Sequence, residues 1–149
     1  MRRFDREPLA GFVSPQSYLQ PGGVELMSQD GAVSIIPYAE VKTVSFVKDF
    51  DAVEPERKLF NTRPKMGGLW VRMKFRDGDE MDGILSNNLL HLDTYGFTVT
   101  PPDPYANNQR VFLPRAALLD LQVLGVVGSP LKRGKKKPAA SKDQIKLFE

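Results

Sequence analysis

The sequence predicts a mainly β protein made of two tandem small five-stranded barrels, followed by a disordered basic C-terminal tail. Apolar and polar residues alternate with the period of two that strands require, most clearly in GLWVRMKF at residues 68–75. The succession of strands, glycines and prolines in residues 1–50 recurs in residues 69–128, which indicates two copies of one unit. Closure of each unit into a barrel would remove its exposed sheet edges.

The first repeat, residues 1–50, aligns with the second through its glycines and prolines. LAGFVSPQSYL parallels MDGILSNNLLHL and aligns Gly11 with Gly83. GGVELM parallels YGFTVT, and VSIIPYAEVKTVSFV parallels RVFLPRAALLDLQVL, which aligns Pro37 with Pro114. We therefore expect the same order of strands and turns in both repeats.

A linker over residues 51–68, with a short helix at about residues 55–60, is predicted to join the repeats.

The second repeat, residues 69–128, opens with a hairpin whose turn is Asp77-Gly78. Three further strands are expected in YGFTVTPPD, QRVFLP and LLDLQVLGVV, with a single helical turn in RAALLD before the last of them. The tail, residues 129–149, is rich in Lys, Pro, Gly and Ala and is predicted to be disordered.

The residue types favour a protein without catalytic activity, metal or cofactor. Cysteine is absent and His91 is the only histidine, and the G-x-S-x-G and H-E-x-x-H patterns do not occur. The acidic group in the predicted hairpin is interpreted as a solvated turn, because strand alternation sends its carboxylates to different faces. Its members are Asp77, Asp79, Glu80 and Asp82.

Export and membrane insertion are not expected from this sequence. Its longest apolar runs are only a few residues, far below the length of a membrane span. Its first residues, MRRFDREPLAG, lack the apolar segment of a signal peptide. We therefore expect a cytoplasmic protein without a membrane partner.

The positive charge of the chain is concentrated in the tail. Of the net charge of +3, residues 129–149 carry seven basic and two acidic residues, a net +5, whereas residues 1–128 carry 14 basic and 16 acidic residues, a net −2. A slightly acidic body is a poor footprint for nucleic acid, but the tail suits weak contacts with DNA phosphates. The residues expected to make them are Lys132, Arg133, Lys135, Lys136 and Lys137.

The second repeat resembles the Sm-like and SH3-like small β-barrels over residues 69–125. The Sm-like pattern has a hydrophobic strand, an Asp-Gly turn, a G-x-L element and a final pair of short strands, which correspond here to VRMKFRDGDEMDGILSNNLLHL and RVFLPRAALLDLQVL. In that family, polar residues after G-x-L and a basic residue in the last hairpin line an RNA site. The resemblance implies RNA contacts at Asn88, His91 and Arg115.

The stretch QIKLF at residues 144–148 resembles the bacterial sliding-clamp-binding motif, a peptide of the form Q-[L/I]-x-L-F. All five positions match. The Gln144 amide can donate and accept hydrogen bonds at a pocket rim. Leu147 and Phe148 can fill a hydrophobic pocket, with Ile145 packed beside them. The resemblance implies that the bacterial sliding clamp is the protein partner.

The same peptide could instead dock on its own body. Ser141-x-x-Gln144 has the form of a capping box, although the five residues after it are too few for a stable isolated helix. The IKLF stretch could also add a strand to one of the barrels, and a different protein partner is a further alternative.

These features lead to two main hypotheses of function. The first is a non-enzymatic adaptor or accessory protein of bacterial DNA replication or repair, which binds the sliding clamp through QIKLF. The second is an Sm-like RNA-binding protein that uses the second repeat and the basic tail. A regulatory barrel that binds a protein or a cyclic nucleotide is a third hypothesis, and the sequence does not decide the oligomeric state.

Overall fold

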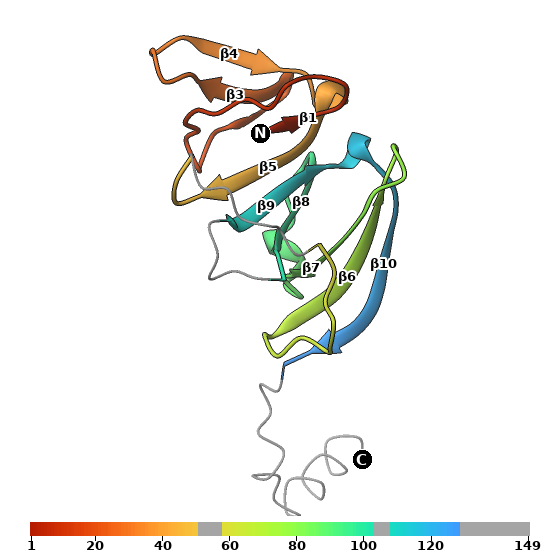
Figure 1. The fold of residues 1–149 in the computed structure, drawn as a ribbon. Coiled ribbons are helices and arrows are strands. Elements are labelled where there is room, and N and C mark those ends of the chain that lie inside the picture. Colours follow the sequence, from red (N-terminus) through yellow and green to blue (C-terminus); the bar gives the residue numbers. More distant parts are fainter. Residues whose placement is uncertain (51–57, 103–107, 129–149) are drawn as a thin grey trace, which may run out of the picture.

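The computed structural model describes residues 1–50, 58–102 and 108–128 of the chain. This part contains ten strands and three 3-10 helices of three residues each, with no α-helix, so the prediction of a mainly β protein is confirmed (Figure 1). The strands are β1 (Arg2–Arg3), β2 (Leu19–Gln20), β3 (Gly23–Met27), β4 (Val33–Ile36), β5 (Val41–Val47), β6 (Gly68–Phe75), β7 (Glu80–Leu85), β8 (Gly96–Thr100), β9 (Asn108–Pro114) and β10 (Leu118–Val127). The 3-10 helices are η1 (Tyr38–Glu40), η2 (Leu89–His91) and η3 (Arg115–Ala117).

The strands form two antiparallel sheets. Seven strands follow the order β1-β5-β9-β8-β7-β6-β10, and three follow the order β2-β3-β4. Two closed five-stranded barrels are not found among the described strands. The reason lies at β9, which pairs with β8 on one side and with β5 of the first repeat on the other, so that it does not close onto β10.

The predicted hairpin and the strands after it are confirmed by the pairing of the second repeat. β6 and β7 pair antiparallel around the Asp77-Gly78 turn, and Gly78 has a φ of 95°, which glycine adopts without steric cost. β10 returns to pair with β6, just as β5 returns to pair with β1 in the first repeat. In both repeats the returning strand directly follows a 3-10 turn that begins after a proline, Pro37 or Pro114.

Two glycines allow the same close strand approach in each repeat. A Cβ atom on Gly23 would lie 2.1 Å from the carbonyl oxygen of Ile36, and one on Gly96 would lie 2.1 Å from that of Leu113. In both cases the carbonyl belongs to the residue immediately before the proline of the 3-10 turn. The sequence correspondence between GGVELM and YGFTVT therefore has a steric cause.

The body has two hydrophobic cores, and β9 contributes to both. Phe112 packs in the core of the first repeat, whereas its neighbours Val111 and Leu113 pack in the core of the second. This division follows from the alternation of side chains along a strand. The first core contains Tyr18, Val24, Val41, Val44 and Phe112. The second contains Val71, Met73, Phe75, Leu85, Val99, Val111, Leu113 and Ala117.

The described part of the linker, residues 58–67, contains no helix, and the first half of the short helix predicted at about residues 55–60 lies outside the described residues. The linker backbone is held to β7, because the Asp82 amide donates to the Lys58 carbonyl oxygen at 2.7 Å. The tail predicted to be disordered, residues 129–149, lies outside the described residues. Over the described ranges, no helix has the length and apolar character needed to cross a membrane.

Candidate functional site

The loop between β7 and β8 holds two of the predicted RNA-contacting residues, Asn88 and His91. Asn88 Oδ1 accepts a hydrogen bond from the Leu90 amide at 3.1 Å and caps η2. The His91 ring lies between two side chains, with Nδ1 3.3 Å from Ser86 Oγ and Nε2 3.3 Å from Asn88 Nδ2. Because Asn88 Nδ2 can only donate, this arrangement assigns the His91 proton to Nδ1. The polar side chains of the loop therefore form hydrogen bonds within the loop itself.

Two leucines beside these polar groups are strongly exposed. Leu89 is 71% and Leu90 91% exposed, the highest values among the large apolar side chains of the described residues. An exposed apolar pair at a loop tip is a better contact for another protein than for phosphates. This loop therefore presents an apolar surface beside its polar groups.

Arg115, the third predicted RNA-contacting residue, lies in η3 with aromatic neighbours. Its guanidinium carbon is 5.2 Å from the centre of the Phe97 ring, a cation–π distance. Its backbone amide donates to the Tyr95 carbonyl at 2.9 Å, and the Tyr95 ring stacks on Tyr38 of the first repeat with 4.8 Å between ring centres. Asn88 and His91 therefore lie together in one loop, whereas Arg115 contacts a separate group of aromatic residues.

Lys42 connects the two repeats through an ion-pair cluster that the sequence analysis missed. Its Nζ lies 2.7 Å from Asp77 Oδ2 and 2.5 Å from Asp79 Oδ2, both in the β6–β7 turn. Burial alone would lower the pKa of Lys42, but the two carboxylates outweigh it and raise that pKa above its ordinary value. The turn is therefore held by β5, while Asp77, Asp79 and Glu80 stay exposed, as expected for a solvated turn. The described residues contain no group of three or more potential metal ligands.

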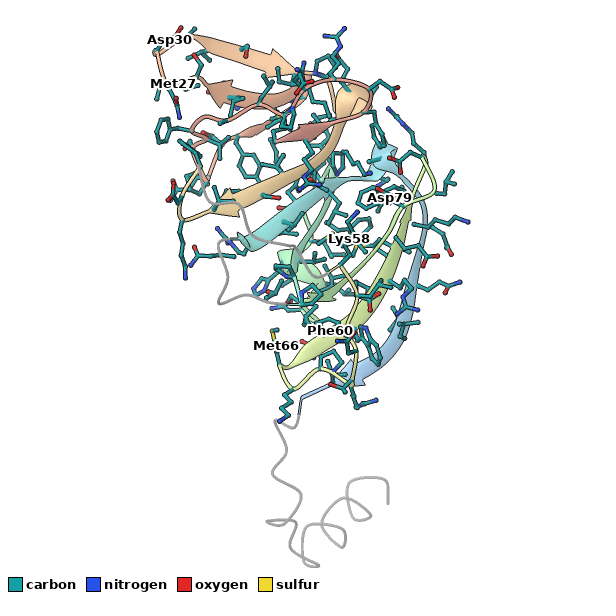
Figure 2. All side chains as sticks on the ribbon, in the orientation of Figure 1. Met27, Asp30, Lys58, Phe60, Met66 and Asp79 are labelled. Atoms are coloured by element: carbon teal, nitrogen blue, oxygen red, sulfur yellow. The ribbon has the colours of Figure 1, made fainter. Side chains whose placement is uncertain are left out.

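Asp82 corrects the expectation of a solvated acidic turn, because its side chain is completely buried. Its carboxylate accepts hydrogen bonds from Arg72 Nε at 2.7 Å, from Arg72 Nη2 at 3.0 Å and from Trp70 Nε1 at 3.3 Å. The Phe60 amide donates to the same group at 3.0 Å. Figure 2 shows Asp79, Lys58 and Phe60 in this order from the hairpin turn down along β6. Asp82 thus attaches the linker to the hairpin.

The sequence holds only part of the signal for this pairing, because Arg72 and Asp82 lie in the two arms of the predicted hairpin. The register places them directly across from each other because the turn has three residues, 76–78, whereas counting from a two-residue Asp77-Gly78 turn would place Asp82 across from Met73. Oppositely charged residues that face each other across a hairpin attract. Burial of the pair could not be predicted in this way, because it depends on where the linker runs.

The first repeat has a groove of about 740 Å³ between its N-terminal segment and β5. Phe12, Phe46 and Phe50 line it, with Phe12 and Phe50 packed edge to face at 5.5 Å between ring centres. At one side, the Arg110 guanidinium lies 5.0 Å from the Phe46 ring centre.

The tail residues predicted to bind DNA or the sliding clamp lie outside the described residues. They are Lys132, Arg133, Lys135, Lys136, Lys137, Gln144, Ile145, Leu147 and Phe148. The last described strand, β10, ends at Val127. The clamp-binding and DNA-binding assignments therefore stay predictions from sequence.

Comparison with known proteins places the chain in a family without an assigned role. A family model described as a family of unknown function, DUF6982, matches residues 1–125, and the chain belongs to this family. No curated protein and no solved structure matches the chain. The matched region covers the first repeat and the second repeat up to residue 125, and it stops before the tail.

Proposed function

We propose that this member of a family of unknown function is a non-enzymatic cytoplasmic adaptor that binds the bacterial DNA sliding clamp and acts in DNA replication or repair. The observation that carries the proposal is QIKLF at residues 144–148, which fills all five positions of the clamp-binding pattern. The peptide lies beyond the family match, which stops at residue 125, and beyond the end of β10. The ten described strands all lie before it in the sequence.

The basic stretch before the peptide adds a weak contact with DNA. Its five cations between residues 132 and 137 can neutralise phosphates without reading sequence. In this proposal the clamp peptide supplies specificity, and the basic stretch strengthens binding only where DNA is already nearby. High salt should weaken the DNA contact much more than the mainly apolar clamp contact.

The body is then the part that the tail delivers to the clamp. Each repeat follows the strand succession of a five-stranded small barrel of the Sm-like or SH3-like kind, and we read the body as two such units joined edge to edge. The exposed pair Leu89 and Leu90, the aromatic groove and the free strand edges suit protein contacts. This supports an adaptor more than an enzyme.

Fluorescence anisotropy of the labelled full-length protein, titrated with a purified bacterial sliding clamp, tests the proposal. We expect saturable binding that is abolished by the double substitution Leu147→Ala and Phe148→Ala, because both anchors are lost. Lys146→Ala is the matched control, since the motif leaves this position free and binding should persist. Equal binding by the double variant and the wild type would refute the clamp assignment.

A thermal melt of the same variants separates clamp binding from self-docking. If IKLF packed on the groove or on a strand edge of its own body, the double substitution would lower the melting temperature. We expect no change, because in the proposal the peptide is not part of the folded body. A lower melting temperature together with absent clamp binding would support the self-docked arrangement.

The second candidate function, RNA binding, is favoured by one observation. Arg115 over Phe97, beside the stacked pair Tyr95 and Tyr38, combines a cation with aromatic rings on which a base can stack. Salt-dependent binding of short single-stranded RNA that survives deletion of residues 129–149 would support it. Loss of that binding in Arg115→Ala, with Asn88→Ala and His91→Ala as companion variants, would assign the residues.

A further inference from the structure

The junction between the two repeats is a strand pair with a defined register. β5 of the first repeat pairs antiparallel with β9 of the second, so that Val44 faces Phe112 and Ser45 faces Val111. Phe112 is completely buried in the core of the first repeat. Besides the two-residue outer strands β1 and β2, the repeats have two kinds of edge that this junction illustrates: the returning strand, β5 or β10, and the strand before the 3-10 turn, β4 or β9. One edge of each kind is used inside the chain.

The two edges that the junction does not use are exposed and apolar. Within the described residues, β4 pairs only with β3 and β10 pairs only with β6. Val33 on β4 is 62% exposed and Val123 on β10 is 55% exposed. Exposed apolar edge strands are unusual in a protein that stays monomeric, because they invite pairing with another chain. Figure 1 shows β4 at the upper end of the molecule and β10 along its lower right side.

We propose that copies of this chain associate head to tail, with β4 of one copy paired antiparallel to β10 of the next. The occupant of each edge is thus a second copy of the chain. The internal junction provides the pattern, because β4 occupies the position of β9 in its repeat and β10 occupies the position of β5. The inference does not depend on the tail or on clamp binding.

The register of the proposed contact follows from the 77 positions that separate Pro37 from Pro114. Applied to the internal pairs, this spacing places Leu121 opposite Ile35, Gln122 opposite Ser34, and Val123 opposite Val33. Apolar residues then face apolar residues, and the one polar pair can form a hydrogen bond. The residues of β4 and β10 take no part in the internal junction. Their apolar and polar match is therefore an observation independent of the β5–β9 pairing from which the register was taken.

The side-chain directions agree with this register. Ile35 takes the position of Phe112, the side chain that the second repeat inserts into the core of the first. Leu121, its proposed partner, packs at the margin of the second core, as Val44 packs in the first. Ile35 of one copy would therefore extend the second core of its neighbour. A contact between two different surfaces of the same chain generates a ring if it closes and a filament if it does not.

Size-exclusion chromatography with light scattering tests the proposal on the full-length protein. We expect the wild type to have the mass of several copies, and Val33→Lys and Val123→Glu each to have the mass of one copy, because either substitution disrupts every junction. An equimolar mixture should regain the higher mass, since the introduced lysine of one variant then faces the introduced glutamate of the other and the remaining edges are unchanged. Val126→Lys, similarly exposed on β10 but outside the three pairs, is the control that should stay assembled.

Three results would overturn the inference. A wild type that has the mass of one copy at every soluble concentration would show that the edges do not pair. Assembly that persists in both single variants would place the contact on another surface. Assembly that is lost when residues 129–149 are deleted, but kept in Val33→Lys, would identify the tail as the occupant. Thermal melts of the variants confirm that each one is folded.

Discussion

Asp82 is the buried charge that connects the β6–β7 hairpin with the linker. Removal of one partner from a buried ion pair usually costs about 3–5 kcal/mol, but Arg72 is 35% exposed and can regain water. We therefore expect Asp82→Asn to lower the free energy of unfolding by about 2 kcal/mol, measured by urea denaturation. Asp120→Asn, on the exposed part of β10, is the control and should change stability little. Equal stability of Asp82→Asn and the wild type would show that the carboxylate charge is dispensable.

The same residue gives the protein a pH dependence of known sign. Burial alone would raise the pKa of Asp82, but hydrogen bonds from Arg72, the Phe60 amide and Trp70 outweigh it, so that the pKa in the folded protein is lowered. The unfolded chain has an Asp pKa of about 3.9. As the pH falls through this value, the unfolded state takes up a proton before the folded state does, and acid favours unfolding.

We therefore expect the stability due to Asp82 to be complete above the unfolded pKa and to be lost as the pH falls toward the folded one. Between about pH 5 and pH 3, the wild type should lose more stability than Asp82→Asn. Urea midpoints of both proteins at several pH values measure the difference, because the other carboxylates are common to both. Parallel loss of stability in the two proteins would contradict the assignment.

At the scale of the elements, the strand crossing at Gly96 tests the steric reading of the repeat. A methyl group there would lie 2.1 Å from the Leu113 carbonyl oxygen, so the backbone must move. We expect Gly96→Ala to cost about 3 kcal/mol, measured as a lower urea midpoint. Gly67→Ala is the matched control, because its methyl group would meet open space. A stable Gly96→Ala would mean that β8 and β9 can separate without loss.

Local sequence patterns predicted most of the strands but not the partners of their edges. Alternation and the Asp77-Gly78 turn led to the β6–β7 hairpin, and apolar runs between turn residues led to β8, β9 and β10. The pairing of β9 with β5 could not be predicted, because alternation shows which face of a strand is buried and not which edge finds a partner. Because β9 pairs with β5, the expectation of closed barrels was wrong.

The candidate site shows the same limit. Asn88 and His91 are neighbours in sequence, and their grouping in one loop could be expected from their spacing. The separation of Arg115 from them, and the Lys42 contact with the hairpin turn, depend on how the repeats pack together. Such contacts join residues far apart in the chain, and no local pattern records them.

At the scale of the whole molecule, head-to-tail assembly and clamp binding together predict avidity. An assembly presents several QIKLF peptides, so on a surface densely coated with sliding clamp a second peptide binds from a high effective concentration. We expect the assembled wild type to dissociate from such a surface roughly 10²-fold more slowly than Val33→Lys. On a sparsely coated surface, or with the isolated peptide, the two should behave alike. Surface plasmon resonance at two clamp densities measures this, with Val126→Lys as the assembled control. Equal dissociation of Val33→Lys and the wild type at high density, despite different masses in solution, would show that the assembly does not present its tails together.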